Sequence, residues 1–261
     1  MESKYSVPGV MTDPGEAAER VARLPGDFGG IAEVLHGLCI HEFMGDMYGV
    51  DKMDRETVHL RRASDLLDAV VSRDPRPLDE AREPADRLAT NCRGFTVLAV
   101  TILRAHGVPA RARCGFGGYF TPGFFEDHWV VEYYEDGRWK RGDAQLDAVV
   151  LAEFKIDFDP ADLPDGQFLT GGEAWELFRR GGADPNTFGL GDTGAGDWWI
   201  AGNLVRDVAA MDNVEALPWD CWDPMPKPSE SFDYQLFDHL DTTKVPDTVY
   251  NAVRDRVEPF R

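Results

Sequence analysis

The amino-acid sequence predicts an α+β fold in which one long helix packs on an antiparallel sheet and a helical, tryptophan-rich extension follows. Three observations predict this arrangement. A helical pattern covers residues 91–107, and a hairpin pattern covers residues 127–145. After these, four of the seven tryptophans lie between Trp198 and Trp222, which is typical of a packed region rather than a tail.

The predicted helix is bounded by clear start and stop signals. Thr90 or Asn91 can cap its start, while Gly107 supplies a left-handed end and Pro109 prevents continuation. Three-and-four spacing of apolar residues predicts a single buried face. That face comprises Phe95, Leu98, Ala99, Ile102 and Leu103. Cys92 therefore lies in the first turn.

The first turn of a helix is a favourable place for a reactive thiol. Its free backbone N–H groups carry partial positive charge, which favours thiolate over thiol. The same groups can bind the oxyanion that forms when a thiolate attacks an amide carbonyl. Cys92 is therefore the candidate nucleophile, whereas we expect Cys39, Cys114 and Cys221 to be small hydrophobic residues of the core.

The hairpin is predicted by Asp136-Gly137, which stands between runs of aromatic and β-branched residues. If these two residues form the turn, Glu135 faces Arg138, and the pairing continues outward by one residue on each strand. Glu132 then faces Arg141. Opposite charges on facing positions support this register.

The same register brings a histidine and an aspartate together. Asp143 is expected to face Val130, and Gln145 to face His128. Because side chains on one strand face recur every second residue, His128 and Asp143 become diagonal neighbours, with α-carbons roughly 7–8 Å apart. An imidazole and a carboxylate can meet at that separation. Asp143 is therefore the candidate residue that orients His128.

Four short motifs occur in order: Asn91-Cys92-Arg93-Gly94, Gly107-Val108-Pro109-Ala110-Arg111, Asp127-His128-Trp129 and Trp139-Lys140-Arg141-Gly142-Asp143. With them, the segment 86–145 resembles the core of the transglutaminase-like superfamily, whose members have a papain-like cysteine proteinase fold. The resemblance implies that Cys92 is the nucleophile, His128 the general base and then acid, and Asp143 the orienting residue. Related enzymes often add an upstream Gln or Trp for the oxyanion, and no such residue stands out before Cys92.

We expect residues 1–261 to form a single globular unit, with a transglutaminase-like core at 60–150 and a C-terminal extension at 151–261 packed on it. Two helices and one irregular Pro- and Trp-rich segment are predicted in the extension, at 172–180, 198–210 and 217–228. The extension resembles that of a group of bacterial transglutaminase-like proteins with no assigned substrate.

The segment 115–125 is expected to be a loop between the strand after the helix and the hairpin. Its aromatic residues either pack locally or form the rim of a substrate channel, and its glycines would let it move. The candidate substrate-binding residues are Tyr119, Phe124, Phe125, Trp129 and Gln145. No Gly-Lys-Ser/Thr follows the glycines, so this is not a phosphate-binding loop.

Composition excludes several partners and favours one compartment. A formal charge of −20 argues against nucleic acid and anionic membranes, and reflects either solubility, which we favour, or attraction of cationic substrates. No apolar run approaches the roughly 20 residues of a membrane span.

Four cysteines without a secretory signal favour a reducing compartment, hence a cytoplasmic protein. No cofactor or metal is expected, because His36 and His41 are five residues apart and face different helix sides.

Three classes of function follow from these observations. The first is a thiol-dependent acyltransferase or amidase, in which Cys92 attacks a peptide bond or carboxamide. The substrate would be an amide-containing peptide, protein or small molecule, and the acyl group would pass to water or to an amine. The second is a catalytically silent binding module, and the third a metalloprotein. The complete set of Cys92, His128 and Asp143 favours the enzyme, with hydrolysis slightly ahead of amine transfer.

Overall fold

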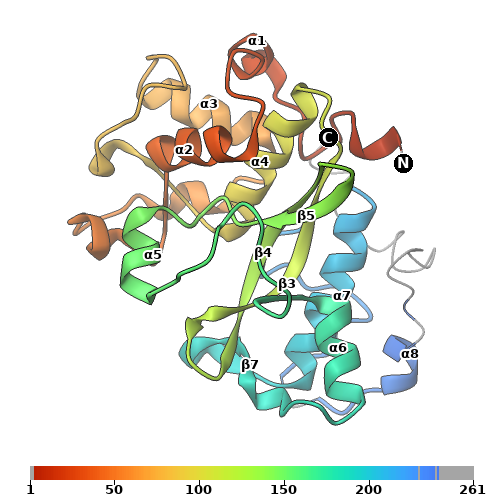
Figure 1. Ribbon diagram of the computed structural model, residues 1–261. Helices are drawn as coiled ribbons and strands as arrows, with labels where there is room; N and C mark the ends of the chain where they lie inside the picture. The colour runs from red at the N-terminus through yellow and green to blue at the C-terminus, as the bar shows by residue number, and fades with distance from the viewer. Residues whose placement is uncertain (1–2, 229, 239, 241–261) are drawn as a thin grey trace. The chain divides into compact units, whose positions relative to one another are not determined.

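The computed structural model describes residues 3–228, 230–238 and 240. The chain divides into two compact units, which are described here separately. Unit 1 contains Met1–Ala112 and Val130–Leu163, and unit 2 contains Arg113–Trp129 and Pro164–Arg261. Two strands, β3 (Ala110–Thr121) and β4 (Phe124–Glu135), run from one unit into the other (Figure 1). Within the described residues, no helix is both long and apolar enough to cross a bilayer.

Unit 1 is mainly helical. Its helices are α1 (Ala18–Val21), α2 (Phe28–Leu38), α3 (Ala63–Arg73), α4 (Cys92–Ala105) and α5 (Ala148–Phe154). Short 3-10 turns lie at Ser3–Tyr5, Gly15–Ala17, Gly45–Tyr48, Arg55–His59 and Pro84–Asp86. Strands β1 (Cys39–His41) and β2 (Leu88–Thr90) pair in parallel, and β2 leads directly into α4.

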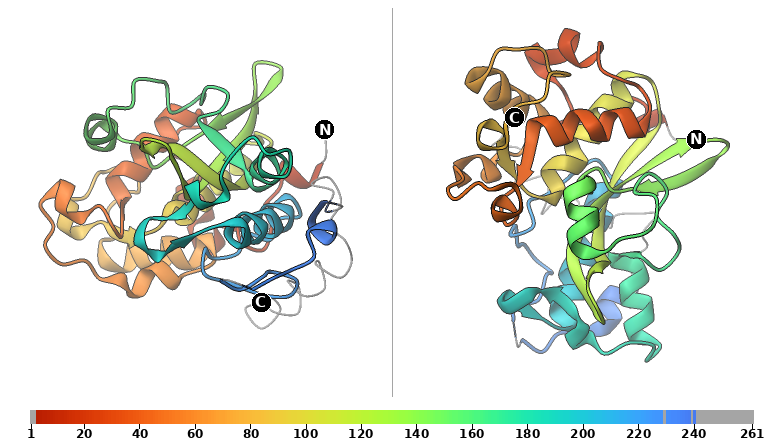
Figure 2. Two further views of the ribbon diagram at one scale, coloured as in Figure 1. Left: turned by 90° about the horizontal axis from the view of Figure 1, so that it is seen from below. Right: turned by 60° about the vertical axis from the view of Figure 1, so that its left-hand side comes forward.

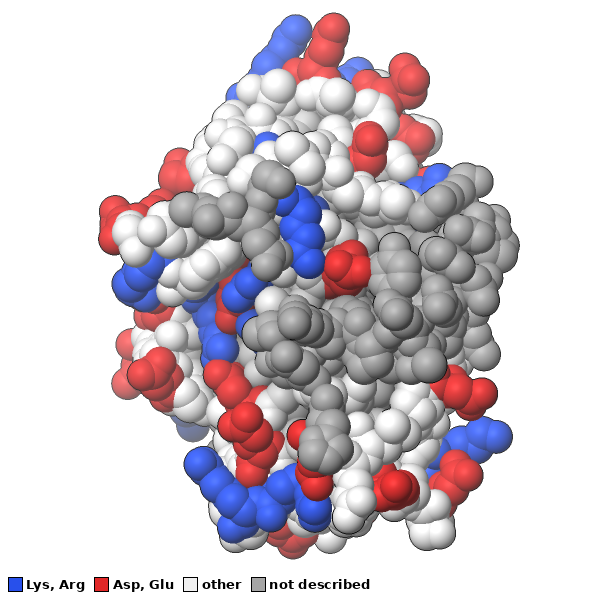
Figure 3. Space-filling model, turned by 90° about the vertical axis from the view of Figure 1, so that its right-hand side faces the viewer, with Lys and Arg blue, Asp and Glu red and all other residues white. Residues whose placement is uncertain are grey.

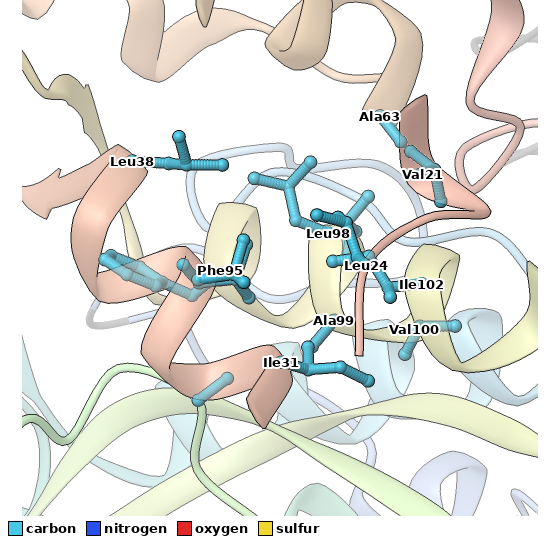
Figure 4. Packing of buried hydrophobic residues seen from close by; sticks show 14 of the residues in the cluster. Val21, Leu24, Ile31, Leu38, Ala63, Phe95, Leu98, Ala99, Val100 and Ile102 are labelled. Atoms are coloured by element: carbon cyan, nitrogen blue, oxygen red, sulfur yellow. The ribbon is translucent and has the colours of Figure 1, made fainter. Parts of the chain in front are cut away.

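Helix α4 is confirmed, but it is buried on all sides rather than on a single face. Every residue from Cys92 to Arg104 is buried. The helix packs against α2 and α3, and Phe95 and Leu98 lie in the same cluster as Ile31 of α2 (Figure 4). Val131 and Tyr133 of β4 belong to the same core. Each Leu or Phe buried there contributes about 1.5–3 kcal/mol. A central helix of this kind gives its first residue a fixed position in unit 1.

The predicted hairpin is also confirmed. Asp136 and Gly137 have φ values of 53° and 81°, as a type I′ turn requires, and β5 (Arg138–Gly142) pairs with β4. Glu132 faces Arg141, and the Arg141 Nε atom lies 3.0 Å from Glu132 Oε1. The last observed pair joins Val131 to Gly142. The predicted facing of Asp143 and Val130 lies beyond that pair and stays a prediction.

Unit 2 is built on the remaining strands. Its elements are β6 (Phe168–Thr170), α6 (Gly171–Arg179), β7 (Phe188–Leu190), β8 (Gly194–Ala195), α7 (Asp197–Met211) and α8 (Tyr234–Asp238), with 3-10 turns at Pro185–Thr187 and Gly191–Thr193. The strands are ordered β6-β3-β4-β7-β8. Helices α6 and α7 lie side by side (Figure 2). They confirm the two predicted helices, and residues 217–228 contain neither helix nor strand.

The segment 115–125 is not a loop, contrary to our expectation. It belongs to β3 and β4, which are joined by a tight turn in which Gly123 has a φ of 77°. Gly115 is required by close strand pairing, because a Cβ atom there would lie 2.0 Å from the Leu169 carbonyl oxygen of β6. The glycine therefore permits packing rather than motion.

Candidate functional site

Cys92 is the first residue of α4, and the residues around it fix the start of the helix. Asn91, not Thr90, is the cap: its Oδ1 atom accepts a hydrogen bond from the Gly94 N–H at 3.0 Å. Its Nδ2 atom donates to the Val58 carbonyl at 3.2 Å. Gly94 must be a glycine, because a Cβ atom would lie 2.0 Å from Thr90 Oγ1. The Cys92 side chain is held at a helix start and is only 6% exposed.

Asp143 follows β5 in unit 1, and hydrogen bonds to backbone groups hold it in place. Its N–H donates to the Pro160 carbonyl at 2.8 Å, and its Oδ1 atom accepts from the Gln145 N–H at 3.0 Å. His36 of α2 lies near this carboxylate. Burial lowers the pKa of His36, and the charges of Asp147 and Asp143 act in the opposite direction. Asp143 is thus buried and interacts with the His36 imidazole.

Gln145 is buried two residues further along the chain. Its Nε2 atom donates to the Met44 sulfur at 3.6 Å. Its Oε1 atom is buried and has no hydrogen-bond partner among the described residues. A buried amide oxygen without a partner is costly, so this atom is available to a ligand N–H group.

His128 lies on β4 in unit 2, where it is buried between aromatic rings. The edge of its imidazole meets the ring of Tyr119 at 5.9 Å and that of Phe120 at 5.0 Å between centroids. Tyr119 was among the predicted site residues. Phe120 was not predicted as a site residue, because we expected residues 115–125 to be a loop, and a loop does not indicate which side chains lie near His128.

Asp127, next to His128, is anchored by the C-terminal extension. Its Oδ2 atom accepts a hydrogen bond from Trp199 Nε1 at 2.6 Å. Burial raises the pKa of Asp127, while the charge of Arg206 and hydrogen bonds from Trp199 and Asn203 oppose this effect. Sequence reasoning missed this network, since 72 residues separate Trp199 from Asp127 and no local pattern links them.

The other predicted substrate-binding residues have different surroundings. Trp129 is 1% exposed, and its buried Nε1 atom lacks a hydrogen-bond partner among the described residues. Phe125 stacks on Phe188 at 4.8 Å in the core of unit 2, and Phe124 is half-buried. Unit 1 thus contains Cys92, Asp143 and Gln145, and unit 2 contains His128, Tyr119, Phe124, Phe125 and Trp129.

The remaining cysteines separate into two kinds. Cys39 and Cys114 are buried as predicted, and burial raises the pKa of Cys39 to about 12. Cys221 is exposed, so its prediction as a core residue was wrong. It lies in the irregular segment 217–228, which has no helix or strand whose periodicity would direct the side chain into the core. Across the described part of the chain, no group of three or more His, Cys, Asp or Glu side chains is arranged to hold a metal ion.

Comparisons with known proteins find a family match for one region of the chain. Residues 51–144 match the family model of the transglutaminase-like superfamily. A structural match is the crystal structure named "Putative Cysteine Protease from Cytophaga hutchinsonii", with 15% identity and a TM-score of 0.35, covering 55% of this chain and 41% of that one. At that TM-score the likeness carries no argument about function. No curated protein matches the sequence.

Proposed function

We propose that this protein is a thiol-dependent enzyme that cleaves an amide bond through a Cys92 acyl-enzyme, since residues 51–144 match the family model of the transglutaminase-like superfamily. The observation that carries the proposal is the place of Cys92 as the first residue of a capped, buried helix. His128 and Asp143 lie inside the same matched region, which ends one residue after Asp143.

In the proposed reaction the Cys92 thiolate attacks the carbonyl carbon of the amide. The backbone N–H groups at the start of α4 stabilise the oxyanion, as helix N-termini do elsewhere. The C–N bond then breaks, and the His128 imidazolium gives its proton to the leaving amine. Asp143 keeps the imidazole in the required tautomer and orientation. A thioester on Cys92 remains.

The proposed substrate is a peptide, a protein or a small carboxamide. Two features support an amide-containing group. The unpartnered Oε1 atom of Gln145 can accept a hydrogen bond from an amide N–H, and Tyr119 and Phe120 offer aromatic edges beside His128. Trp129, Phe124 and Phe125 are proposed to shape the same surroundings in unit 2.

The thioester is then resolved by water or by an amine, and we propose water. Amine transfer would gain from a concentrated negative surface, which raises the local concentration of cations. On the face shown in Figure 3, however, Asp and Glu side chains are interspersed with Lys and Arg. We therefore assign the charge of −20 to general solubility, and the described part of this face offers no support for amine attraction.

The proposal is tested by trapping the acyl-enzyme. The protein is mixed with a library of peptides and small carboxamides, quenched in acid, and digested for mass spectrometry. We expect an acyl adduct on Cys92 that is absent in Cys92→Ala and unchanged in Cys221→Ser, which removes the exposed thiol. Adding a labelled primary amine then distinguishes acid from amide product. Substrate that binds with equal affinity to wild type and Cys92→Ala, without any adduct, would instead identify the binding module.

A further inference from the structure

Unit 2 contains a cavity that the proposed reaction does not use. Its volume is 230 Å³, and it lies between α7 and the irregular segment 217–228. Most of its wall is aromatic or apolar, with contributions from Trp198, Trp199, Pro218, Trp219 and Met225. A wall of this composition favours the burial of an apolar group of side-chain size.

One charged side chain forms part of this apolar wall. Arg206 is 8% exposed. Its Nη1 atom donates to Asn203 Oδ1 at 2.9 Å, and its Nη2 atom donates to the Asp220 carbonyl at 2.9 Å. Its Nε atom is buried and has no hydrogen-bond partner in the described chain. Both of these acceptors are neutral, so neither hydrogen bond neutralises the buried guanidinium.

Asp127 is a buried acidic group that interacts with this charge. Asp127 feels the charge of Arg206, but burial has the larger effect and raises the pKa of Asp127. One of its carboxylate oxygens also accepts the Trp199 N–H. The buried Nε atom of Arg206 therefore remains available to a carboxylate oxygen.

The rest of the cavity has the same sign of charge. Exposed Lys227 is a second cation on the lining, and no Asp or Glu is found among the described lining residues. Gly202 leaves space for the guanidinium, because a Cβ atom there would lie 3.2 Å from Arg206 Nη1. The cavity thus combines an apolar wall with positive charge.

We propose that this cavity binds a small carboxylic acid with an apolar or aromatic body. The carboxylate pairs with Arg206 in a charge-assisted hydrogen bond, and the body packs on Trp199 and Trp219. Because Trp199 also donates to Asp127 beside His128, the occupied cavity stabilises the strand that carries the imidazole. This last effect rests on the proposed function, whereas binding itself does not.

The test uses 4-phenylbutyrate as the probe and 4-phenylbutanamide, its neutral counterpart, as the control. Cys221 is exposed and lines the same cavity, so its alkylation by iodoacetamide reports occupancy. Measured by site-resolved mass spectrometry on the full chain, the acid should slow alkylation of Cys221 at concentrations about tenfold lower than the amide does. Equal protection by both compounds, or protection by neither, would overturn the proposal.

Variants locate the binding group. Arg206→Gln should weaken the acid about tenfold and leave the amide unchanged, with folding checked by circular dichroism. Lys227→Gln changes an exposed residue and should weaken the acid by a smaller factor while flattening its salt dependence. An acid affinity unaltered in both variants would contradict the assignment. Binding should persist in Cys92→Ala, so failure of the proposed enzymatic activity would not alter this result.

Discussion

The helices α4 and α7 are both buried, but the two units stabilise them in different ways. The core around α4 is mainly apolar; Asn91 caps the start of the helix, and the few polar side chains further along it, such as Thr101 and Arg104, mostly bond to backbone carbonyls. Helix α7 instead buries the polar side chains Asn203, Arg206 and Asp207. Apolar packing and a helix cap therefore position Cys92 in unit 1, whereas hydrogen bonds between side chains and strands position the surroundings of His128 in unit 2.

The polar network of unit 2 joins α7 to β3 through directional hydrogen bonds. Asp207 accepts from Arg113 Nε at 2.8 Å and Nη2 at 2.7 Å, and also from the Cys114 N–H at 3.0 Å. Asn203 donates to the Gly115 carbonyl at 3.0 Å. Both interactions join α7 to β3. A network of this kind fixes register more strictly than apolar packing, and is more sensitive to the loss of one member.

The largest effect is expected for Asp207→Ala. The change leaves the Arg113 guanidinium buried without its carboxylate, at a cost of about 3–5 kcal/mol in the free energy of unfolding. Urea denaturation followed by tryptophan fluorescence measures it. Asp207→Asn is the matched control, because it keeps an acceptor for Cys114 while removing the charge. A loss below about 1 kcal/mol in Asp207→Ala would show that α7 is held by packing, as α4 is.

The corresponding change in unit 1 should be smaller. Asn91→Ala removes the helix cap and the bond to Val58, and should lower the free energy of unfolding by about 1–2 kcal/mol. Asn91→Asp keeps the capping acceptor and should recover most of this loss. Urea denaturation of the wild type and both variants measures these differences. Equal losses of unfolding free energy in Asn91→Ala and Asn91→Asp would contradict the claim that the cap helps to position Cys92.

The smallest predicted effect is the pH dependence due to Asp127. Its pKa is raised by burial, so its neutral form stabilises the fold. That contribution is fully present below the unfolded pKa of about 3.9 and is lost as pH rises through the folded value. Relative to Asp127→Asn, which keeps an acceptor for Trp199, the wild type should therefore lose stability as pH rises.

Urea titrations of both proteins at a series of pH values from acid to neutral measure the difference. Asp192→Asn, which changes an exposed carboxylate, serves as the control. A stability difference between wild type and Asp127→Asn that does not vary with pH would contradict the burial of this carboxyl group.

Local sequence signals predicted the parts of unit 1 that depend on short-range chemistry. Asn91 and Gly107 bound α4, and Asp136-Gly137 sets the register that pairs Glu132 with Arg141. The amphipathic pattern underestimated burial, because polar residues on the second face of α4 are also buried; Thr101 and Arg104 there bond to the Val97 and Ala110 carbonyls.

Unit 2 was harder to predict because its contacts are distant in sequence. The bond from Trp199 to Asp127 and the ion pair between Arg113 and Asp207 join residues that share no local period. The glycine at position 115 indicated a loop, whereas it serves the close approach of β6. The boundaries between the two units could not be predicted from composition, because they fall inside the continuous strands β3 and β4 and not in a linker. The packing of an extension, 151–261, on a core stays a prediction.

The proposed function requires the His128 imidazole to activate the Cys92 thiol, and the most direct test is the rate of Cys92 alkylation below neutral pH. Iodoacetamide labelling at pH 6, resolved by site with mass spectrometry, should be faster at Cys92 than at exposed Cys221, although Cys92 is only 6% exposed. His128→Ala should slow labelling of Cys92 by about tenfold or more and leave Cys221 unchanged. An identical Cys92 rate in His128→Ala and wild type would contradict the account.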